Sequence, residues 1–145
     1  MRTMPRKVSD IMTTSPRSLP LEATLYEAAQ VMRDSGIGDV LVTFAGRLCG
    51  LVTDRDIVVR GVAESRDPAL TPLSDVCTAD LITVRADEDA LAAAQLMGRQ
   101  AIRRLPVVDD ERRPIGIVSI GDLAMVDEGL DRNTLSDISK APPSL

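Results

Sequence analysis

Two seven-residue stretches, Gly50–Asp56 and Gly116–Asp122, carry the residue types in this sequence that are best suited to bind a ligand. In each one an apolar run leads into a hydroxyl residue, Thr53 or Ser119, and a carboxylate follows three positions later. A hydroxyl residue at this point is a typical helix N-cap, so each stretch predicts a strand that ends where a helix begins. Free backbone N–H groups and the positive end of the helix dipole favour an anion there, and the carboxylate can accept hydrogen bonds from a sugar diol. Together these groups suggest a phosphate and a ribose, and therefore a nucleotide.

The same residues also have a purely structural interpretation. Thr-x-x-Asp and Ser-x-x-Asp are capping boxes with a shorter acid, in which Asp56 and Asp122 serve only to hold the first turn of a helix. For one copy alone we favour capping. The second copy at the same spacing gives ribose binding equal weight, so both interpretations stay open at this point.

Composition limits the classes of function that the chain can have. It has 145 residues, of which 44% are hydrophobic and 27% charged, which is typical of one ordinary globular domain or two small ones. The net charge of −5 argues against a nucleic-acid partner, which would require a basic face. The aromatic residues are Tyr26 and Phe44 alone, so a bound base would lie between aliphatic side chains. Histidine is absent, and no nucleophile–base pair or metal-ligand cluster is visible, so we expect neither an enzyme nor a metal site.

The two cysteines, Cys49 and Cys77, lie in apolar strings far apart in the sequence and form no C-x-x-C motif. Buried thiols are the expected state, with a disulfide or redox role as the alternative. The chain has neither an 18-residue apolar run nor a charged-then-apolar leader, so we expect a soluble cytoplasmic protein with no membrane contact.

An internal repeat is the main feature of the chain as a whole. Val8–Thr13 is matched by Leu73–Thr78 at an offset of 65 residues, and the two glycine-led stretches are offset by 66. Between these landmarks each copy has a helix with an Ala-Ala-x-x-Met pattern, which begins near Thr24 in the first copy and near Asp89 in the second. The extra residue falls in the polar turn at 109–113, where an insertion costs least.

Strand patterns complete each copy as strand, helix, strand, hairpin, strand and helix. The predicted strands lie at 18–19, 40–44, 48–53, 105–108 and 115–119, and Gly36 ends the first helix. We expect repeat 1 at residues 8–62, a linker at 63–72, repeat 2 at 73–126 and a tail at 127–145 with a short helix at 130–140. Residues 1–7 should form a loose basic start, and residues 141–145 should fray. A copy of about fifty residues buries little surface alone, so we expect the two to pack sheet to sheet with pseudo-twofold symmetry.

The repeat, the Asp-Ile-Met-Thr opening, the Ala-Ala-x-x-Met helices and the two Gly-x-x-[Thr/Ser]-x-x-Asp closures closely resemble a tandem cystathionine-β-synthase (CBS) domain pair, also called a Bateman module. The resemblance covers residues 8–125, and the string Thr53–Val58 is similar to stand-alone bacterial CBS-pair proteins. It implies an α+β fold with a mixed three-stranded sheet and helices in each unit, and a disc-shaped homodimer, parallel or antiparallel. It also implies regulatory binding of adenosine nucleotides in clefts between the two units, with no required cofactor and no catalysis by the module itself.

The resemblance also assigns ligand-binding residues by position. In cleft A it implies Thr53 and Asp56 from the first unit, with Ile82, Arg103, Arg104 and Pro106 from the second. In cleft B it implies Ser119 and Asp122 from the second unit, with Thr13, Arg17, Gly38 and Asp39 from the first.

The two clefts differ in charge. Arg103 and Arg104 would bring two positive charges to a phosphate in cleft A, where one charge-assisted hydrogen bond contributes about 1.5 to 3 kcal/mol. Cleft B has Asp39 at the position of Arg104, with Arg17 as the nearby cation, so we expect cleft A to hold the ligand. The alternative for the two arginines is an exposed basic pair at a strand edge.

Three functions follow as hypotheses. The first is a sensor that binds AMP, ADP, ATP or another adenosyl compound and changes its shape or its partner surface in response. The second is a ligand-free structural or protein-interaction module that acts as a homodimer, with an unidentified regulated protein as a further partner. An enzyme is the third, and the lack of a visible catalytic group places it behind the other two.

Overall fold

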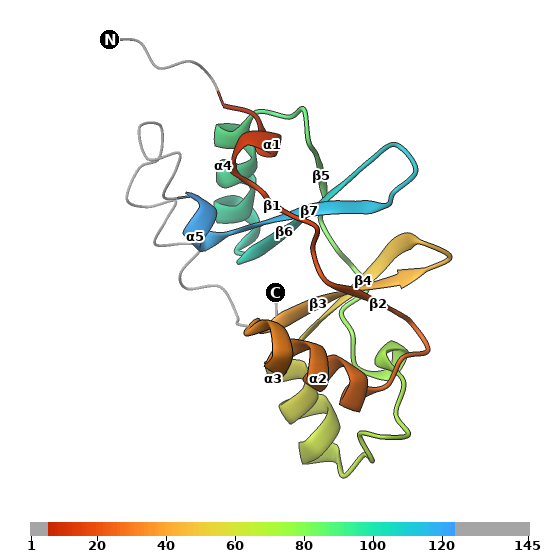
Figure 1. Ribbon diagram of the computed structural model, residues 1–145. Helices are drawn as coiled ribbons and strands as arrows, with labels where there is room; N and C mark the ends of the chain where they lie inside the picture. Colours follow the sequence, from red (N-terminus) through yellow and green to blue (C-terminus); the bar gives the residue numbers. More distant parts are fainter. Residues whose placement is uncertain (1–5, 124–145) are drawn as a thin grey trace. The chain divides into compact units, whose positions relative to one another are not determined.

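The computed structural model describes residues 6–123 of the chain, and its secondary structure is of the α+β class predicted from the sequence. The described residues form two compact units (Figure 1). Unit 1 contains residues 6–15 and 82–123, and unit 2 contains residues 16–81. Each unit has its own sheet, its own helices and its own core.

Unit 2 is built on a three-stranded sheet with the strand order β2-β3-β4. Strand β2 runs parallel to β3, and the connection between them contains α2, as a parallel pair requires. Strands β3 and β4 form an antiparallel hairpin that turns at Ala45 and Gly46, both of which have positive φ. The elements of this unit are β2 (Ser18–Pro20), α2 (Leu25–Ser35), β3 (Asp39–Phe44), β4 (Arg47–Thr53), α3 (Asp54–Asp56), the π-helical turn η1 (Ile57–Gly61) and the 3-10 turns η2 (Val62–Glu64) and η3 (Leu73–Asp75).

Unit 1 repeats this plan with one additional strand. Its sheet has the order β1-β7-β6-β5, in which β5 and β6 are parallel and β6 and β7 form an antiparallel hairpin. The resemblance implied three strands per unit, whereas here β1 adds a fourth, antiparallel to the free edge of β7. The elements of this unit are α1 (Val8–Ile11), β1 (Thr13–Thr14), β5 (Val84–Arg85), α4 (Ala90–Gln100), β6 (Arg104–Val108), β7 (Pro114–Ser119) and α5 (Ile120–Leu123).

The two longer helices begin at the residues expected from their sequences. The Thr24 hydroxyl accepts a hydrogen bond from the Glu27 N–H at 3.2 Å, and the Glu27 carboxylate accepts one from the Thr24 N–H at 3.2 Å, so α2 starts with a complete capping box. Helix α2 ends at Gly36, whose φ of 64° is the left-handed conformation that glycine adopts readily. Helix α4 begins after Asp89, whose carboxylate accepts from the Leu91 N–H at 3.3 Å.

The opening segment of each repeat packs onto the body of the other repeat. The first opening segment, Val8–Thr13, belongs to unit 1, where it forms α1 and leads into β1 along the edge of β7. The second, Leu73–Thr78, belongs to unit 2, where Thr78 pairs with β4 through two backbone hydrogen bonds of 3.0 and 2.9 Å. The two compact units are therefore crosswise combinations of the two repeats.

A glycine in β4 and another in β7 make room for the opening segments. A Cβ placed on Gly50 of β4 would lie 2.9 Å from Sγ of Cys77. A Cβ placed on Gly116 of β7 would meet Sδ of Met12, which is the residue of the first opening segment that matches Cys77. In both units a sulfur-containing side chain thus lies over a glycine, where a larger residue would push it away.

Aliphatic side chains fill both cores. Tyr26 and Phe44 are exposed, so neither core contains an aromatic ring from the described residues. The core of unit 1 is built from Val8, Ile11, Val84, Ala90, Ala93, Ala94, Met97, Leu105, Val107, Val118 and Leu123. The core of unit 2 is built from Ala23, Leu25, Ala28, Met32, Val40, Val42, Val52, Leu73 and Val76.

The predicted strands are all present. The four longer ones, β3, β4, β6 and β7, each begin one residue earlier than predicted, and the strand predicted at 18–19 is β2. The helix predicted at 130–140, the fraying end at 141–145 and most of the loose start at 1–7 lie outside the described residues. Within residues 6–123, no helix has both the length and the apolar character needed to cross a membrane.

Candidate ligand-binding site

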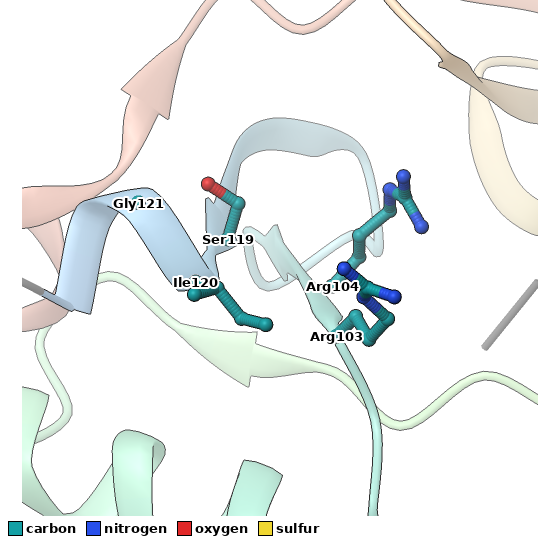
Figure 2. Close-up of a pocket in the computed structure, with 5 residues that line it drawn as sticks. All are labelled: Arg103, Arg104, Ser119, Ile120 and Gly121. Carbon is teal, nitrogen blue, oxygen red and sulfur yellow. The ribbon is translucent and has the colours of Figure 1, made fainter. Parts of the chain in front are cut away.

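A pocket in unit 1 lies where β7 passes into α5 (Figure 2). It has a volume of about 140 Å³ and is lined by Arg103, Arg104, Ser119, Ile120 and Gly121. The antiparallel pairing of β6 with β7 places Arg104 opposite Ser119, which explains why these residues share one pocket. Pockets for whole small-molecule ligands usually measure about 300 to 1,000 Å³, so this pocket has room for one group of a ligand, such as a phosphate.

The two arginines give the pocket a positive side. Figure 2 shows Arg104, the first residue of β6, and Arg103, the residue before it, with Ser119 and Ile120 across from them at the junction of β7 and α5. Both arginines are half-buried, so their guanidinium groups are less hydrated than on an open surface. A guanidinium group can donate two parallel hydrogen bonds to a phosphate or a carboxylate. The pocket is therefore suited to an anionic group.

Ser119 and Asp122 form the capping pair that the sequence predicted. The Ser119 N–H donates to Oδ2 of Asp122 at 2.8 Å, and the Ser119 hydroxyl donates to the same oxygen at 3.1 Å. Asp122 is half-buried, and its other oxygen, Oδ1, takes no part in this cap. An ionised carboxylate accepts hydrogen bonds at both oxygens, so Asp122 can cap α5 and still receive a hydroxyl group from a ligand.

The equivalent pair in unit 2, Thr53 and Asp56, is more deeply buried. Thr53 is 0% exposed and Asp56 is 2% exposed. Oδ2 of Asp56 accepts from the Thr53 N–H at 2.8 Å and from the Thr53 hydroxyl at 3.0 Å. Oδ1 of Asp56 lies 3.9 Å from Nε of Arg60, whose Nη1 also donates to the Val76 carbonyl oxygen at 3.3 Å. Both carboxylate oxygens thus have partners within unit 2, which fits the capping interpretation of Asp56.

The charge reversal noted in the sequence occurs at equivalent positions of the two sheets. Asp39 pairs with Thr53 in unit 2, just as Arg104 pairs with Ser119 in unit 1. A carboxylate next to the hydroxyl residue disfavours a phosphate, whereas a guanidinium group favours it. Of the two equivalent locations, the one in unit 1 is therefore the better anion site.

The residues that the sequence singled out are distributed over both units. Unit 1 contains Thr13, Ile82, Arg103, Arg104, Pro106, Ser119 and Asp122, and unit 2 contains Arg17, Gly38, Asp39, Thr53 and Asp56. The pocket brings Arg103 and Arg104 together with Ser119, although the sequence analysis divided them between cleft A and cleft B. The reason is the β6–β7 hairpin, in which Arg104 pairs with Ser119.

The other predicted residues do not line this pocket. Thr13 is exposed in β1, Pro106 is buried in β6, and Ile82 packs against the unit 1 core. Arg17 donates through Nε to the Ser35 hydroxyl at 3.1 Å, which links the start of unit 2 to the end of α2.

Sequence reasoning missed three residues. Ile120 and Gly121 line the pocket, and their place between Ser119 and Asp122 was the signal that could have identified them. Thr78 has a buried hydroxyl with no hydrogen-bond partner among residues 6–123. The repeat offset of 65 residues makes Thr78 the counterpart of Thr13, so the same argument that selected one applied to the other.

Comparisons with known proteins agree on one domain family. The profile of the CBS domain matches residues 8–62 and 73–129. The CBS domain-containing protein YhcV of Bacillus subtilis is 40% identical over 118 residues, which make up 81% of this chain and 83% of YhcV. Hypoxic response protein 1 of Mycobacterium tuberculosis is 34% identical over 116 residues, which make up 79% of this chain and 80% of that protein.

A solved structure adds a relative with bound ligands. The CBS domain pair of protein MJ0100, in complex with 5′-methylthioadenosine and S-adenosyl-L-methionine, is 28% identical and matches with a TM-score of 0.75. The match covers 87% of this chain and 98% of the MJ0100 chain.

Proposed function

This chain belongs to the CBS-domain family, with two copies of the domain in tandem, and we propose that it is a regulatory protein that binds an adenosyl ligand. The candidate ligands are AMP, ADP, ATP and other adenosyl compounds such as S-adenosylmethionine. In this proposal the protein binds its ligand without transforming it.

The observation that carries the proposal is the joint presence of Arg103, Arg104 and Ser119 in one pocket. Two guanidinium groups supply the hydrogen-bond donors that a phosphate requires, whereas the Ser119 hydroxyl donates its hydrogen to Asp122. Asp122 lies three residues beyond Ser119 and has one oxygen outside its cap. The small volume of the pocket fits a phosphate or another polar end of the ligand, while the adenosine part lies outside it.

The relative MJ0100 supports the class of ligand. Its CBS domain pair binds two compounds that share an adenosine group and differ in charge. This chain has two arginines at the pocket, and its aromatic residues Tyr26 and Phe44 are both exposed. We therefore propose that the ligand is selected by contacts of arginine with its phosphate and of aliphatic side chains with its adenosine group. A ligand shifts the conformation only if it binds one arrangement more tightly than another, so regulation requires that these contacts differ between two states.

The proposal predicts weaker binding when one arginine is removed. Binding of AMP, ADP, ATP and S-adenosylmethionine should be measured by titration calorimetry, with the rise in melting temperature as a second readout. Arg103→Ala should weaken binding of the phosphate-containing ligands about 10- to 100-fold, because one charge-assisted hydrogen bond contributes about 1.5 to 3 kcal/mol. S-adenosylmethionine, which has no phosphate, should be less affected.

Arg99→Ala is the matched control for this experiment. Arg99 is exposed in the last turn of α4, in the same unit, and its removal changes the net charge by the same amount. Equal weakening by both variants would show a general charge effect and would contradict the pocket as the phosphate site. If none of the four compounds binds at millimolar concentration, the sensor hypothesis fails.

The second candidate function is a ligand-free interaction module that acts as a homodimer. The capping roles of Asp56 and Asp122 are complete without a ligand, which favours this alternative. A strip of exposed valines, formed by Val58, Val59 and Val62 on η1 and η2, offers an apolar surface to another chain. We propose that a second copy of the chain covers this valine strip, whether or not a ligand binds.

A further inference from the structure

The two cysteines of the chain lie on the same face of the unit 2 sheet, beside the same glycine. Cys49 and Cys77 are both half-buried, and both pack against the unit 2 core. A Cβ placed on Gly50 would lie 2.9 Å from Sγ of Cys77 and 3.4 Å from its Cβ, and Cys49 directly precedes Gly50 in β4. The sequence contains no other cysteine, so any intramolecular disulfide must join these two.

A β-bulge brings Cys49 to this face. In the pairing of β3 with β4, Val42 lies opposite Gly50 and Thr43 lies opposite Leu48, so Cys49 has no partner of its own. Neighbouring side chains of a regular strand point to opposite faces, but the extra residue of a bulge breaks this alternation. Cys49 therefore faces the unit 2 core, and its thiol donates to the Val42 carbonyl oxygen at 3.4 Å.

We propose that Cys49 and Cys77 are a redox-active pair that forms an intramolecular disulfide under oxidising conditions. Sγ of Cys77 lies 2.9 Å from where a Cβ on Gly50 would be, and Cys49 is the next residue of the strand, so the missing side chain of Gly50 leaves the space in which the two sulfurs can approach. The Cys49 side chain must turn from the Val42 carbonyl oxygen toward Cys77. The bond would fasten the second opening segment to β4, which comes from the other repeat.

The oxidant in this proposal is a low-molecular-weight disulfide. One protein thiol loses its proton, and the thiolate attacks a sulfur of the small disulfide, which gives a mixed disulfide and releases one small thiol. The second protein thiolate then attacks the protein sulfur of the mixed disulfide, closes the internal bond and releases the second small thiol. The protein loses two electrons and two protons in total, and the small disulfide is reduced to two thiols.

The surroundings of the two thiols determine how the rate of this exchange depends on pH. Burial raises the pKa of the Cys49 thiol. Burial is also the largest of the effects that raise the pKa of the Cys77 thiol. Nearby Cys49 and the Asp56 carboxylate raise the pKa of Cys77 further, whereas Arg60 and a backbone hydrogen bond lower it. Because the thiolate is the attacking form, oxidation should become faster as the pH rises through the ordinary thiol range and above it.

The experiment equilibrates the full chain with mixtures of reduced and oxidised glutathione, stops the exchange with acid and alkylates the denatured protein. Mass spectrometry should show a monomer that has lost two hydrogens, both cysteines protected from alkylation, and a peptide that joins Cys49 to Cys77. The bond closes a loop between positions 49 and 77, so the oxidised protein should melt about 5 °C or more above the reduced protein.

The single variants Cys49→Ser and Cys77→Ser provide the controls. Each keeps one thiol, so each should stop at a mixed disulfide with glutathione, and its melting temperature should not rise on oxidation. The proposal is overturned if the natural protein accumulates glutathione adducts or covalently linked chains in place of the internal bond. It is also overturned if the internal bond forms only in denaturant.

Discussion

Asp56 and Asp122 occupy the same position of the two repeats, but they differ in burial and should therefore contribute differently to the stability of the fold. Asp56 is 2% exposed and accepts two hydrogen bonds from Thr53, whereas Asp122 is half-buried and accepts two from Ser119. The same local motif is therefore inaccessible to solvent in unit 2 and partly accessible in unit 1.

Removal of the two carboxylates should measure this difference. Asp56→Ala leaves two buried donors of Thr53 without an acceptor, so the free energy of unfolding should fall by about 2 kcal/mol. Asp122→Ala should lower it by about 1 kcal/mol or less, because water can reach the donors of a half-buried cap. Urea unfolding followed by circular dichroism gives both values, and a larger loss for Asp122→Ala would contradict this account.

The candidate residues could be found from the sequence, but their roles could not. Type and spacing identified Thr53, Asp56, Ser119 and Asp122, because capping is a local property of the chain. The burial of Asp56 depends on packing over long sequence distances, and no local pattern reports it. Arg60 lies four residues after Asp56, a spacing at which side chains of a helix meet, but the sequence analysis did not single it out.

At the scale of elements, strands β4 and β7 depend on their glycines to receive the opening segments. Gly50→Ala would place a Cβ 2.9 Å from Sγ of Cys77 and 3.2 Å from the Thr78 carbonyl oxygen. Because the backbone of the opening segment must shift to relieve the second contact, the free energy of unfolding should fall by about 1 to 3 kcal/mol. Urea unfolding of the variant measures this loss.

Gly121→Ala is the control for the glycine substitution. Among residues 6–123, a Cβ at Gly121 would have one neighbour within 4 Å, the Ser119 hydroxyl at 3.9 Å, so this variant should lose no stability. Cys77→Ala, combined with Gly50→Ala, should recover part of the lost stability because it removes one of the two close contacts. An unchanged stability for Gly50→Ala alone would show that the opening segment adapts without cost.

The sequence predicted the elements whose signal is local. Capping boxes, alternation and turn residues located α2, α4 and the four longer strands to within one or two residues. Strand β1 has two residues, and it exists only because it pairs with β7, about a hundred residues away. The bulge at Cys49 likewise follows from the register of β3 and β4, which a single strand does not reveal.

At the scale of the whole molecule, the valine strip predicts a dimer that one charge can disrupt. Val62 is 59% exposed on η2, so Val62→Asp should not disturb the core of unit 2. An aspartate inside an apolar contact between two chains would be buried without a partner, and the dimer should dissociate at least tenfold more readily. Sedimentation equilibrium measures the dissociation constant.

Leu70→Asp serves as the matched control for the dimer. Leu70 is 78% exposed in unit 2 and lies outside the valine strip, so this variant adds the same charge elsewhere. It should keep the dissociation constant of the natural protein. A natural protein that is monomeric at micromolar concentration would contradict the proposal.

The internal repeat revealed the family, because a duplicated set of weak signals is more specific than any one of them. It did not reveal which segments would pack together. Sequence similarity makes residues 8–13 equivalent to residues 73–78, but this equivalence does not show which of the two compact units each segment packs onto. That choice depends on chain direction and on contacts between residues far apart in the sequence.

The crosswise packing of the opening segments leaves neither repeat complete by itself. In a chain of one repeat alone, the edge strand and the space above its glycine would lack the segment that covers them here, because that segment comes from the other repeat. Such a chain could complete itself only by trading that segment with a second copy, as in domain swapping. A chain cut back to one repeat should therefore pair with a second copy of itself.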